Sequence, residues 1–311
     1  WVEPEGVNPD SDLYRAHPEW IHRSPGREPV TIRNQYVLDL GRPEVEAWAL
    51  RTLRRLVGLG VDHLKWDMNR AITDGVRAGD SHGREAVLQH TRAYLRILDA
   101  LRREFPALTV EACAGGGARI AAPVLARSDV VWPSDETGPR DRLVIQHGFL
   151  SVYPAAAMSS WVTDAVGHRY PKPASLVFRF CVAMSGVLGV GADLRGWSPT
   201  DDDTARAMIA LYREVRGVVL GGEVHRHGDP AEHGYAVEYD GAPGHDRAVV
   251  FVFGRPGRGE PVALRLRGAD PSTHPRVAAT GCSAGWADEG AARGTACRDG
   301  GGGRRPGSLR G

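Results

Sequence analysis

Strand and helix patterns alternate along residues 30–216, and this alternation limits the folds open to the chain. Short runs rich in β-branched and aromatic residues are separated by longer stretches with apolar residues at helical spacing. In one stretch Val45, Ala49 and Leu53 recur every four residues, and Pro43 suits a first helical turn. Strands joined by such helices run parallel through right-handed crossovers. We therefore expect an α/β fold, either an open doubly wound sheet or part of a (β/α)8 barrel, which spacing alone does not separate.

The expected elements follow from the same patterns. Strands are expected at residues 36–40, 61–67, 109–113, 130–135, 155–162 and 187–194. Helices are expected at residues 42–60, 85–105, 122–127, 176–185 and 200–216. The second of these helices is expected to bury the face that carries Leu88, Thr91, Leu95, Leu98 and Leu101.

The pattern changes near Gly217. Short alternating strands divided by Gly, Pro and Asp replace the helical spacing and predict a small antiparallel β domain over residues 217–277. These strands are expected at residues 222–228, 235–240, 247–254 and 262–268. The remaining segment, 278–311, lacks Ile, Val, Phe and Met, so we expect it to be disordered. The expected domains are thus a partial catalytic barrel over 1–216, the β domain, and a disordered tail.

Composition excludes several classes of protein. The formal net charge is +1 with both signs interspersed, which argues against nucleic-acid binding. No apolar run reaches the roughly 18 to 20 residues of a membrane span, and the first residues given do not form a basic segment followed by an apolar core. The four cysteines are too far apart for a zinc site or a disulfide scaffold, so we expect free thiols and a cytoplasmic location. These cysteines are Cys113, Cys181, Cys282 and Cys297.

Charged side chains gather where the strand at residues 61–67 ends. Alternate residues of a strand share a face, so Lys65, Asp67 and Asn69 point one way while Trp66 points the other. An unpaired buried charge costs several kcal/mol, so such a row is tolerated near a solvent-accessible mouth. The carboxyl ends of parallel strands are where α/β folds assemble their sites. From this strand alone, a structural ion pair and a catalytic group are equally consistent.

Three other segments place polar groups at strand ends. Cys113 is followed by glycines at 115–117, Asp135 follows Trp132, and Arg33 precedes a strand. Each has a simpler explanation, namely a tight turn, a helix cap and a solvated arginine. The glycines match neither of the phosphate-binding motifs GxxxxGK[ST] and GxGxxG. Taken together, two strand-end carboxylates flanked by cations and tryptophans are typical of a site for a sugar, which needs dense hydrogen bonding and flat aromatic surface.

Six segments in order resemble consecutive motifs of the microbial α-galactosidases of glycoside hydrolase family 36. They are WVEPEGVNPDSDLY, RNQYVLDL, HLKWDMNR, CAGGGARI, WPSDETGPRDRLVIQHG and FRFCVAMSGVLGVGADL. The resemblance extends from Trp1 to about Val219, and it implies a (β/α)8 barrel that lacks its first two strands here. It also implies a fragment of a longer protein, and we expect the 311 residues alone to be poorly folded or inactive.

The resemblance assigns roles to individual residues. It makes Asp67 the nucleophile and Asp135 the general acid/base of a retaining double displacement. It places Trp1, Arg33, Lys65, Asn69 and Cys113 in the subsite that binds galactose. Retention requires carboxyl groups about 5 to 5.5 Å apart. The resemblance implies no cofactor and no metal, and a small galacto-oligosaccharide such as raffinose or melibiose as substrate.

Two departures from the family pattern concern the site. Glu136 adds a carboxylate beside Asp135, and Arg119 lacks the aspartate that follows the equivalent arginine in many relatives. From the sequence we expect Lys65 to stabilise the ionised form of Asp67, and the apolar neighbours Val131 and Trp132 to favour the protonated acid at Asp135.

Other functions fit the same residues. A transferase that passes galactose to a sugar acceptor, or a hydrolase of N-acetylgalactosaminides, shares this architecture. A non-catalytic carbohydrate-binding protein is a different class of function. The presence of both Asp67 and Asp135 argues against it. A metal-dependent hydrolase is disfavoured because the histidines lack ligand spacing. The sequence leaves the oligomeric state open, although the edges of an incomplete barrel predict self-association.

Overall fold

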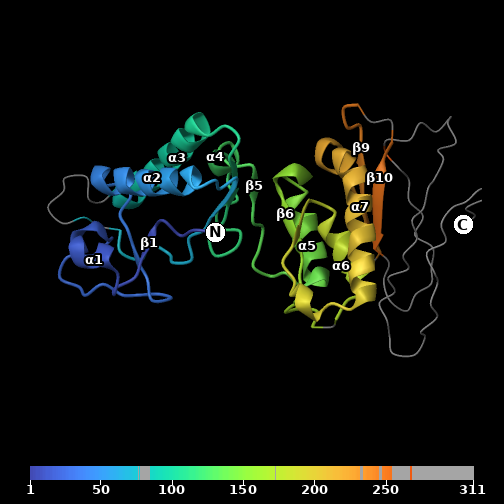
Figure 1. Ribbon diagram of the computed structural model, residues 1–311, viewed down its shortest axis with the longest axis horizontal. Helices are drawn as coiled ribbons and strands as arrows, with labels where there is room; N and C mark the ends of the chain where they lie inside the picture. The colour runs from blue at the N-terminus through green and yellow to red at the C-terminus, as the bar shows by residue number, and fades with distance from the viewer. Residues whose placement is uncertain are drawn as a thin grey trace, which may run out of the picture. The chain divides into compact units, whose positions relative to one another are not determined.

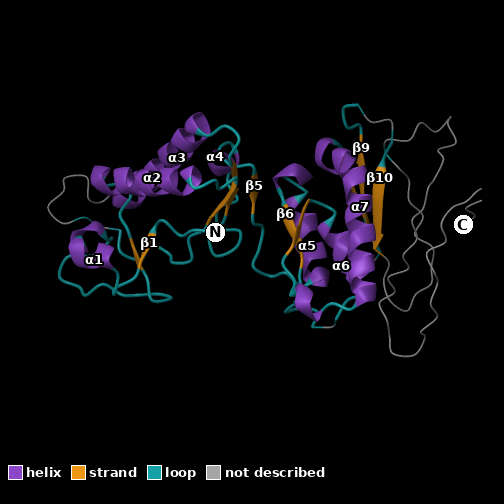
Figure 2. Ribbon diagram, in the orientation of Figure 1, coloured by secondary structure: helices purple, strands orange, loops and turns teal. Residues whose placement is uncertain are grey.

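The structure is a computed structural model in which residues 1–75, 77, 85–171, 173–231, 234–244, 247–253 and 267 are described. The chain divides into two compact units, residues 1–135 and 136–311. Figure 1 traces the chain through both units, and Figure 2 shows helices and strands in each.

The first unit holds a three-stranded parallel sheet flanked by helices. Its elements are β1 (Gly6–Val7), α1 (Asp12–Ala16), η1 (Pro18–Trp20), β2 (Tyr36–Val37), α2 (Pro43–Gly58), β3 (His63–Trp66), α3 (Ala86–Glu104), β4 (Thr109–Ala112), α4 (Ala122–Leu125) and β5 (Val130–Val131). The sheet has the order β3-β4-β5, with Lys65 paired to Glu111. Val2 forms a parallel bridge with Trp66 on the free side of β3. The opening segment therefore lies beside the strand that ends at Asp67.

The strand predicted at residues 36–40 is shorter than expected, and it does not join the parallel sheet. Only Tyr36 and Val37 form a strand, and they pair antiparallel with β1 outside the parallel sheet. The next residue, Leu38, bridges Ile21, and its backbone N–H donates to the carbonyl of Glu5. Apolar alternation predicted extended backbone correctly here, but it carries no information about the partner strand.

Helix α3 forms where predicted, but only part of the expected face is buried. Leu98 and Leu101 are buried as predicted, whereas Leu88 is 46% exposed, Thr91 is exposed, and Leu95 is half-buried. The other buried residues are Ala86, His90, Ala93, Tyr94, Ile97 and Ala100. The prediction counted mainly aliphatic residues, whereas the buried face also carries His90, which contacts Glu5, and Tyr94, whose ring packs against Trp66.

The second unit has a parallel pair and an antiparallel sheet. Its elements are α5 (Pro139–Phe149), η3 (Ala155–Ala157), β6 (Ser159–Val162), α6 (Leu176–Ala183), β7 (Val187–Val190), η4 (Leu194–Gly196), α7 (Pro199–Gly221), β8 (Glu223–His227), β9 (Tyr235–Asp240) and β10 (Val249–Phe253). Strands β6 and β7 pair in parallel, and β8 to β10 form an antiparallel sheet with β9 in the middle. The apolar core of this unit packs α6 and α7 against β6, through Val162, Phe180, Met184 and Met208 among others.

Helix α7 continues five residues beyond its predicted end. Val218 and Val219 are fully buried, so the apolar pattern extends the helix to Gly221. The domain boundary predicted at 216/217 thus lies within this helix, and the domain division stays a prediction. The strand at 262–268 and the tail at 278–311 fall outside the described residues, apart from Arg267.

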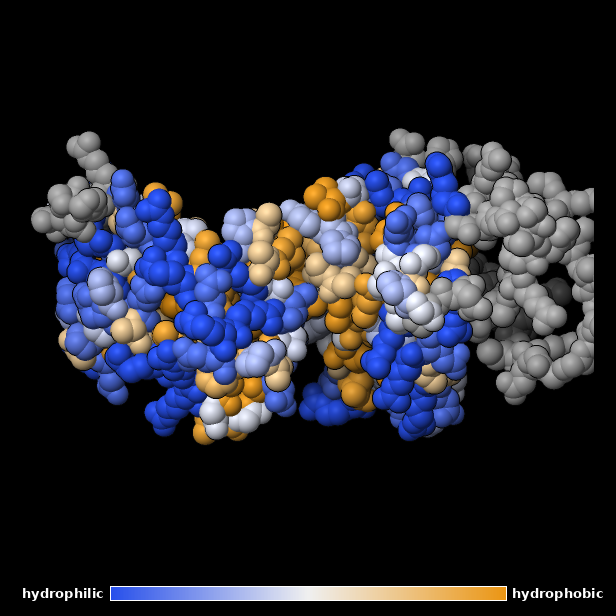
Figure 3. Space-filling view, turned by 90° about the horizontal axis from the view of Figure 1, so that it is seen from above, coloured by the Kyte–Doolittle hydropathy of each residue, from blue (hydrophilic) through white to orange (hydrophobic). Residues whose placement is uncertain are grey.

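The surfaces of the two units differ. Hydrophilic residues cover most of the visible face of the unit that holds α2 and α3, while a column of hydrophobic residues crosses the visible face of the other (Figure 3). The second unit also exposes the large apolar side chains of Val152, Val190 and Leu194. Within the described part of the chain, no helix is both long and apolar enough to cross a membrane. Cys113 and Cys181 are free thiols, and the other two cysteines lie outside the described residues.

Helix α7 begins with a capping box that offers a test of the fold. The Ser198 hydroxyl accepts from the Asp201 backbone N–H at 3.2 Å, and the Asp201 carboxylate accepts from the Ser198 N–H at 3.0 Å. Ser198→Ala should lower the free energy of unfolding by about 1 kcal/mol, because it leaves an orphan N–H in the first turn. Thr204→Ala, at a half-buried position of the same helix beyond its cap, is the control and should change it by less than about 0.5 kcal/mol. Equal effects in urea denaturation would contradict the capping role.

Candidate active site

The side chain of Asp67 is held directly after β3 by a set of hydrogen-bond donors. One carboxylate oxygen accepts from the backbone N–H of Met68 at 2.7 Å and of Gly115 at 3.3 Å. The other accepts from Asn69 Nδ2 at 2.8 Å. Cys113 donates a further hydrogen bond. Asp67 is only 1% exposed, so these donors replace the water that a surface carboxylate would bind.

The donors determine the charge of this carboxyl group. Burial alone would raise the pKa of Asp67, but hydrogen bonds from Cys113, Asn69 and the two backbone amides outweigh it and lower the pKa. Burial and the neighbouring carboxylate raise the pKa of Cys113 to about 12, so its thiol keeps the proton that it donates. Asp67 is thus an ionised, precisely held carboxylate, which is the state that a nucleophile requires.

The glycines at 115–117 connect this carboxylate with Asp135. Gly115 and Gly116 have positive φ angles of 48° and 90°, which a glycine adopts without strain. While Gly115 donates to Asp67, a Cβ on Gly116 would come within 3.1 Å of the Asp135 backbone nitrogen. The turn therefore touches both proposed catalytic residues, and it serves as more than a connection. No phosphate-binding role is needed to explain it.

Asp135 lies at the end of the segment that follows β5. Its carboxylate accepts a hydrogen bond from the indole N–H of Trp132 at 3.0 Å. The sequence predicted apolar company from this tryptophan, whereas the structure aims the polar edge of the ring at the acid. Trp132 is 5% exposed, and the centroid of its ring lies 4.1 Å from the ammonium nitrogen of Lys65.

Lys65 has a carboxylate partner on the neighbouring strand. Its ammonium group lies 3.3 Å from a carboxylate oxygen of Glu111, directly opposite on β4. It also lies 4.7 Å from the centroid of the Trp1 ring, so two tryptophans flank one cation. That Lys65 stabilises the ionised form of Asp67 stays a prediction.

Glu3 and Gln35 belong to the same network, and sequence reasoning missed them. Asn69 Nδ2 donates to Glu3 at 2.8 Å as well as to Asp67, and Gln35 Nε2 donates to the other Glu3 oxygen at 3.1 Å. Both amide hydrogens of Asn69 are thereby used, which leaves its carbonyl oxygen as an acceptor. The sequence signal for Glu3 is the alternation of acidic residues in WVEPEG, which entered the prediction only as part of a family motif.

Two residues discussed in the sequence analysis lie elsewhere. Arg33 is exposed at the tip of a two-residue turn, where Ile32 and Gln35 exchange backbone hydrogen bonds, and no recorded contact joins it to the described site residues. The Glu136 carboxylate accepts from the backbone N–H groups of Gly138 at 2.7 Å and His168 at 2.8 Å. Two backbone amides thus form hydrogen bonds with the negative charge that Glu136 adds.

Behind the site, Arg119 forms a buried ion pair with Glu5. One guanidinium nitrogen lies 2.7 Å from both Glu5 oxygens, and the guanidinium stacks 3.9 Å from the Tyr94 ring centroid. The sequence predicted that Arg119 lacks one likely partner, the missing aspartate, and it did not predict the pairing with Glu5. The second terminal nitrogen of Arg119, Nη1, is buried without a hydrogen bond.

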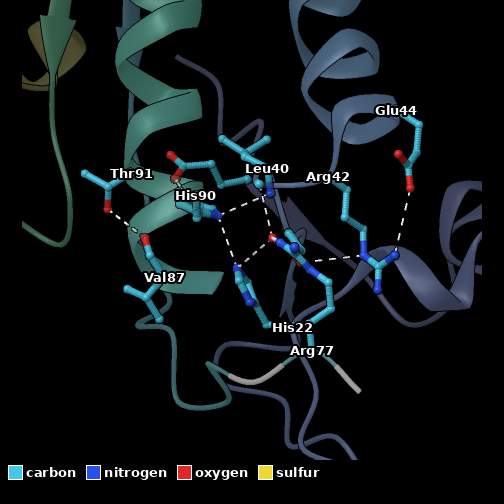
Figure 4. A network of polar contacts seen from close by, with 11 residues as sticks. His22, Leu40, Arg42, Glu44, Arg77, Val87, His90 and Thr91 are labelled. Atoms are coloured by element: carbon cyan, nitrogen blue, oxygen red, sulfur yellow. Dashed lines mark hydrogen bonds and ion pairs between the residues drawn. The ribbon is translucent and has the colours of Figure 1, made fainter. Parts of the chain in front are cut away.

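A chain of buried polar groups continues from Glu5. His90 Nε2 lies 2.7 Å from Glu5, His90 Nδ1 lies 3.2 Å from His22 Nε2, and Asp39 follows at 3.7 Å (Figure 4). The charge of Arg119 and the hydrogen bond from His90 outweigh burial and lower the pKa of Glu5 to about 2. Burial lowers the pKa of His22 to about 4, which Asp39 only partly offsets. His22 is therefore neutral at pH 7.

His22, Asp39 and His90 place three potential metal ligands within 4.8 Å of one another. The Arg77 guanidinium, however, contacts both Asp39 oxygens, at 2.5 and 2.8 Å, and Arg42 lies 3.5 Å away. Two nearby cations oppose a metal ion, and the His22 and His90 rings already contact each other directly. We interpret this cluster as a structural hydrogen-bond chain.

Comparison with known proteins assigns the chain to a family. The sequence profile of the Melibiase family matches residues 1–222. The chain is 32% identical over 285 residues to α-galactosidase 1 of Pediococcus pentosaceus, covering 90% of this chain and 39% of that protein. It is 38% identical over 227 residues to the α-galactosidase of Escherichia coli, covering 73% and 32%. The chain belongs to the Melibiase family.

Solved structures give the same result for the fold. The crystal structure of the family 36 α-galactosidase AgaB from Geobacillus stearothermophilus superposes with a TM-score of 0.82 at 34% identity, covering 87% of this chain and 38% of that one. A variant of AgaA from the same organism, in complex with raffinose, gives a TM-score of 0.81 at 32% identity, with the same coverage. The fold is thus that of family 36 glycosidases. The chain spans less than two fifths of the length of these relatives.

The buried network predicts how stability depends on pH. An unfolded histidine binds a proton near pH 6.5, but folded His22 does so only near pH 4, and Glu5 shifts similarly from 4.5 to about 2. The unfolded chain binds more protons in both intervals, so stability is highest above pH 6.5 and falls as the pH drops. Each shift corresponds to roughly 3 kcal/mol. The free energy of unfolding, measured by urea denaturation, should decline from pH 6.5 to 2.

His22→Gln isolates the upper part of this dependence. The variant removes the imidazole but keeps a donor and an acceptor, so its stability should change less between pH 6.5 and 4 than that of the wild type. The readout is the slope of the free energy of unfolding against pH. A loss of stability at pH 7 does not affect this slope. Parallel curves for the two proteins would show that His22 is not buried in its neutral form.

The close approach at Gly117 provides a second test of the site. A Cβ there would lie 2.5 Å from the carbonyl oxygen of Pro133, which leads to Asp135. Gly117→Ala should therefore cost about 1 to 3 kcal/mol of stability, because backbone must move to relieve the clash. Gly58→Ala is the matched control, since no atom lies within 4 Å of its Cβ, and it should be neutral or stabilising by up to about 1 kcal/mol. Equal effects would exclude the close contact.

Proposed function

We propose that this chain carries the catalytic residues of a retaining α-galactosidase, with Asp67 as nucleophile and Asp135 as general acid/base. The observation that carries the proposal is the Asp67 carboxylate. It is buried, ionised and held by four donors, with a glycine turn that contacts the Asp135 backbone. Curated relatives named as α-galactosidases support the reaction, and a family 36 structure in complex with raffinose supports an oligosaccharide substrate.

The proposed reaction has two displacements. An Asp67 oxygen attacks the anomeric carbon of an α-galactoside while the bond to the leaving oxygen breaks, and Asp135 gives that oxygen its proton. Asp135, now a base, takes a proton from water as the water attacks the galactosyl ester, which releases galactose and frees Asp67. The expected separation of about 5 to 5.5 Å between the two carboxyl groups remains a prediction.

The other residues have supporting roles in the proposal. Asn69 and Cys113 hold Asp67 in place, and the Asn69 carbonyl oxygen is the acceptor left for a sugar hydroxyl. Trp1 and Trp132, on either side of Lys65, offer aromatic surface beside a donor, which is the combination that sugars require. Arg33 remains a proposed subsite residue on the family resemblance alone, because it lies on an exposed turn.

We also propose that the parallel strands β3 to β5 and β6 to β7 are segments of one (β/α)8 barrel. Parallel pairing, with helices following the strands, and the similarity to family 36 structures support this arrangement. The antiparallel strands β8 to β10 would then form the following β domain. Raffinose or melibiose is the proposed substrate class.

Rescue by azide tests the two roles separately. The variants Asp67→Ala and Asp135→Ala are prepared in the complete polypeptide encoded by the gene, and hydrolysis of p-nitrophenyl α-galactoside is measured with and without azide. Each variant should lose at least about 100-fold in kcat. In Asp135→Ala, azide should attack the galactosyl ester and give α-galactosyl azide. In Asp67→Ala, azide replaces the nucleophile and should give the β anomer.

The anomeric configuration of the azide product is decisive. Exchanged products would reverse the roles of the two aspartates, and activity near that of the wild type in Asp67→Ala would refute the proposal. Asp99→Asn is the control. Asp99 lies in α3 and forms a partly exposed ion pair with Arg127, so the variant should keep full activity. Excess sucrose as acceptor, followed by product analysis, distinguishes hydrolysis from galactosyl transfer.

A further inference from the structure

One face of the β8–β9 ribbon gathers histidines and carboxylates. Glu223, His225 and His227 alternate along β8, so they share a face, and Asp240 and Glu238 occupy the same face of β9. His225 Nε2 lies 3.1 Å from an Asp240 oxygen, and His227 Nε2 lies 2.8 Å from Glu238. None of these residues belongs to the site proposed for sugar hydrolysis.

The register places two carboxylates directly opposite each other. Glu223 pairs with Asp240, and like charges at directly opposed positions of a β ladder are destabilising. Among the described residues, no lysine or arginine forms an ion pair with either one. Arg226 belongs to the other face of the strand and contacts His147 of α5 at 3.0 Å. No described lysine or arginine therefore offsets the charge of this pair, and His225 is the neighbouring group that contacts it.

The donor atoms have the spacing of a metal site. One ligand atom each from Glu223, His225 and Asp240 lies within 4.8 Å of the other two. Zinc bonds of about 2.0 to 2.2 Å in tetrahedral geometry separate neighbouring ligands by about 3.3 to 3.6 Å. The observed 3.1 Å between His225 and Asp240 is close to that separation, and the exposed Glu223 side chain supplies the third ligand atom within 4.8 Å of both.

We propose that Glu223, His225 and Asp240 bind a divalent transition-metal ion of the Zn²⁺ type, with water in the fourth position. One imidazole and two carboxylates suit Zn²⁺ better than Mg²⁺ or Ca²⁺, which prefer oxygen ligands alone. The ion neutralises the opposed carboxylates and fastens β8 to β9. Since β8 follows α7 after a single residue, the ion also fixes the start of the antiparallel sheet.

Cobalt titration tests the site without reference to activity. The complete polypeptide is treated with EDTA, dialysed and titrated with Co²⁺, whose visible absorption reports tetrahedral ligation, and then Zn²⁺ is added to displace it. One ion should bind per chain, and Zn²⁺ should raise the melting temperature. His225→Gln should weaken binding by about 100-fold or more, since losing even an outer partner of a ligand costs about 10- to 100-fold. Glu223→Gln should weaken it by about 10-fold.

Two controls keep the result interpretable. His227→Gln changes a histidine on the same face, two residues along the strand, and should leave the Co²⁺ spectrum and affinity unchanged. Glu223 is exposed, so Glu223→Gln should fold normally even if His225→Gln does not, and circular dichroism verifies this. Absence of saturable binding in the wild type would overturn the proposal. So would equal affinities of the wild type and Glu223→Gln, or equal losses in His225→Gln and His227→Gln.

Discussion

The first unit depends on one buried carboxylate, that of Glu5. Its two oxygens accept from Trp66 at the end of β3, from His90 in α3, and from Arg119 after the glycine turn, each at 2.7 Å. A single side chain thus joins the opening segment to three elements distant in sequence. Removing one partner of such a buried pair typically costs 3 to 5 kcal/mol, because the other charge stays buried.

The site is built on this support. Trp66 immediately precedes Asp67, and Arg119 follows the glycines that contact both aspartates, so Glu5 fixes the backbone on two sides of the proposed nucleophile. Hydrogen bonds lower the pKa of Asp67 itself against the effect of burial. Hydrogen bonds hold a carboxylate in one orientation while leaving it reactive, whereas a directly paired lysine would compete for its lone pairs.

Histidine and carboxylate groups meet in both units with different consequences. Around His22 and Asp39, Arg77 and Arg42 supply the positive charge. Along β8 and β9 no arginine or lysine among the described residues pairs with Glu223 or Asp240, which is why we assign a metal ion there. The neighbouring charges, more than the ligand types, distinguish the two clusters.

The sequence by itself determined the parallel α/β alternation, the position of Asp67 directly after a strand, and the family, because apolar periodicity and local motifs depend on neighbours along the chain. It could not determine the antiparallel partner of residues 36–37, the buried face of α3, or the pairing of Lys65 with Glu111 and of Arg119 with Glu5. Those contacts join residues far apart in sequence, and a buried charge takes whichever partner the packing brings nearest. Only the tertiary structure decides that.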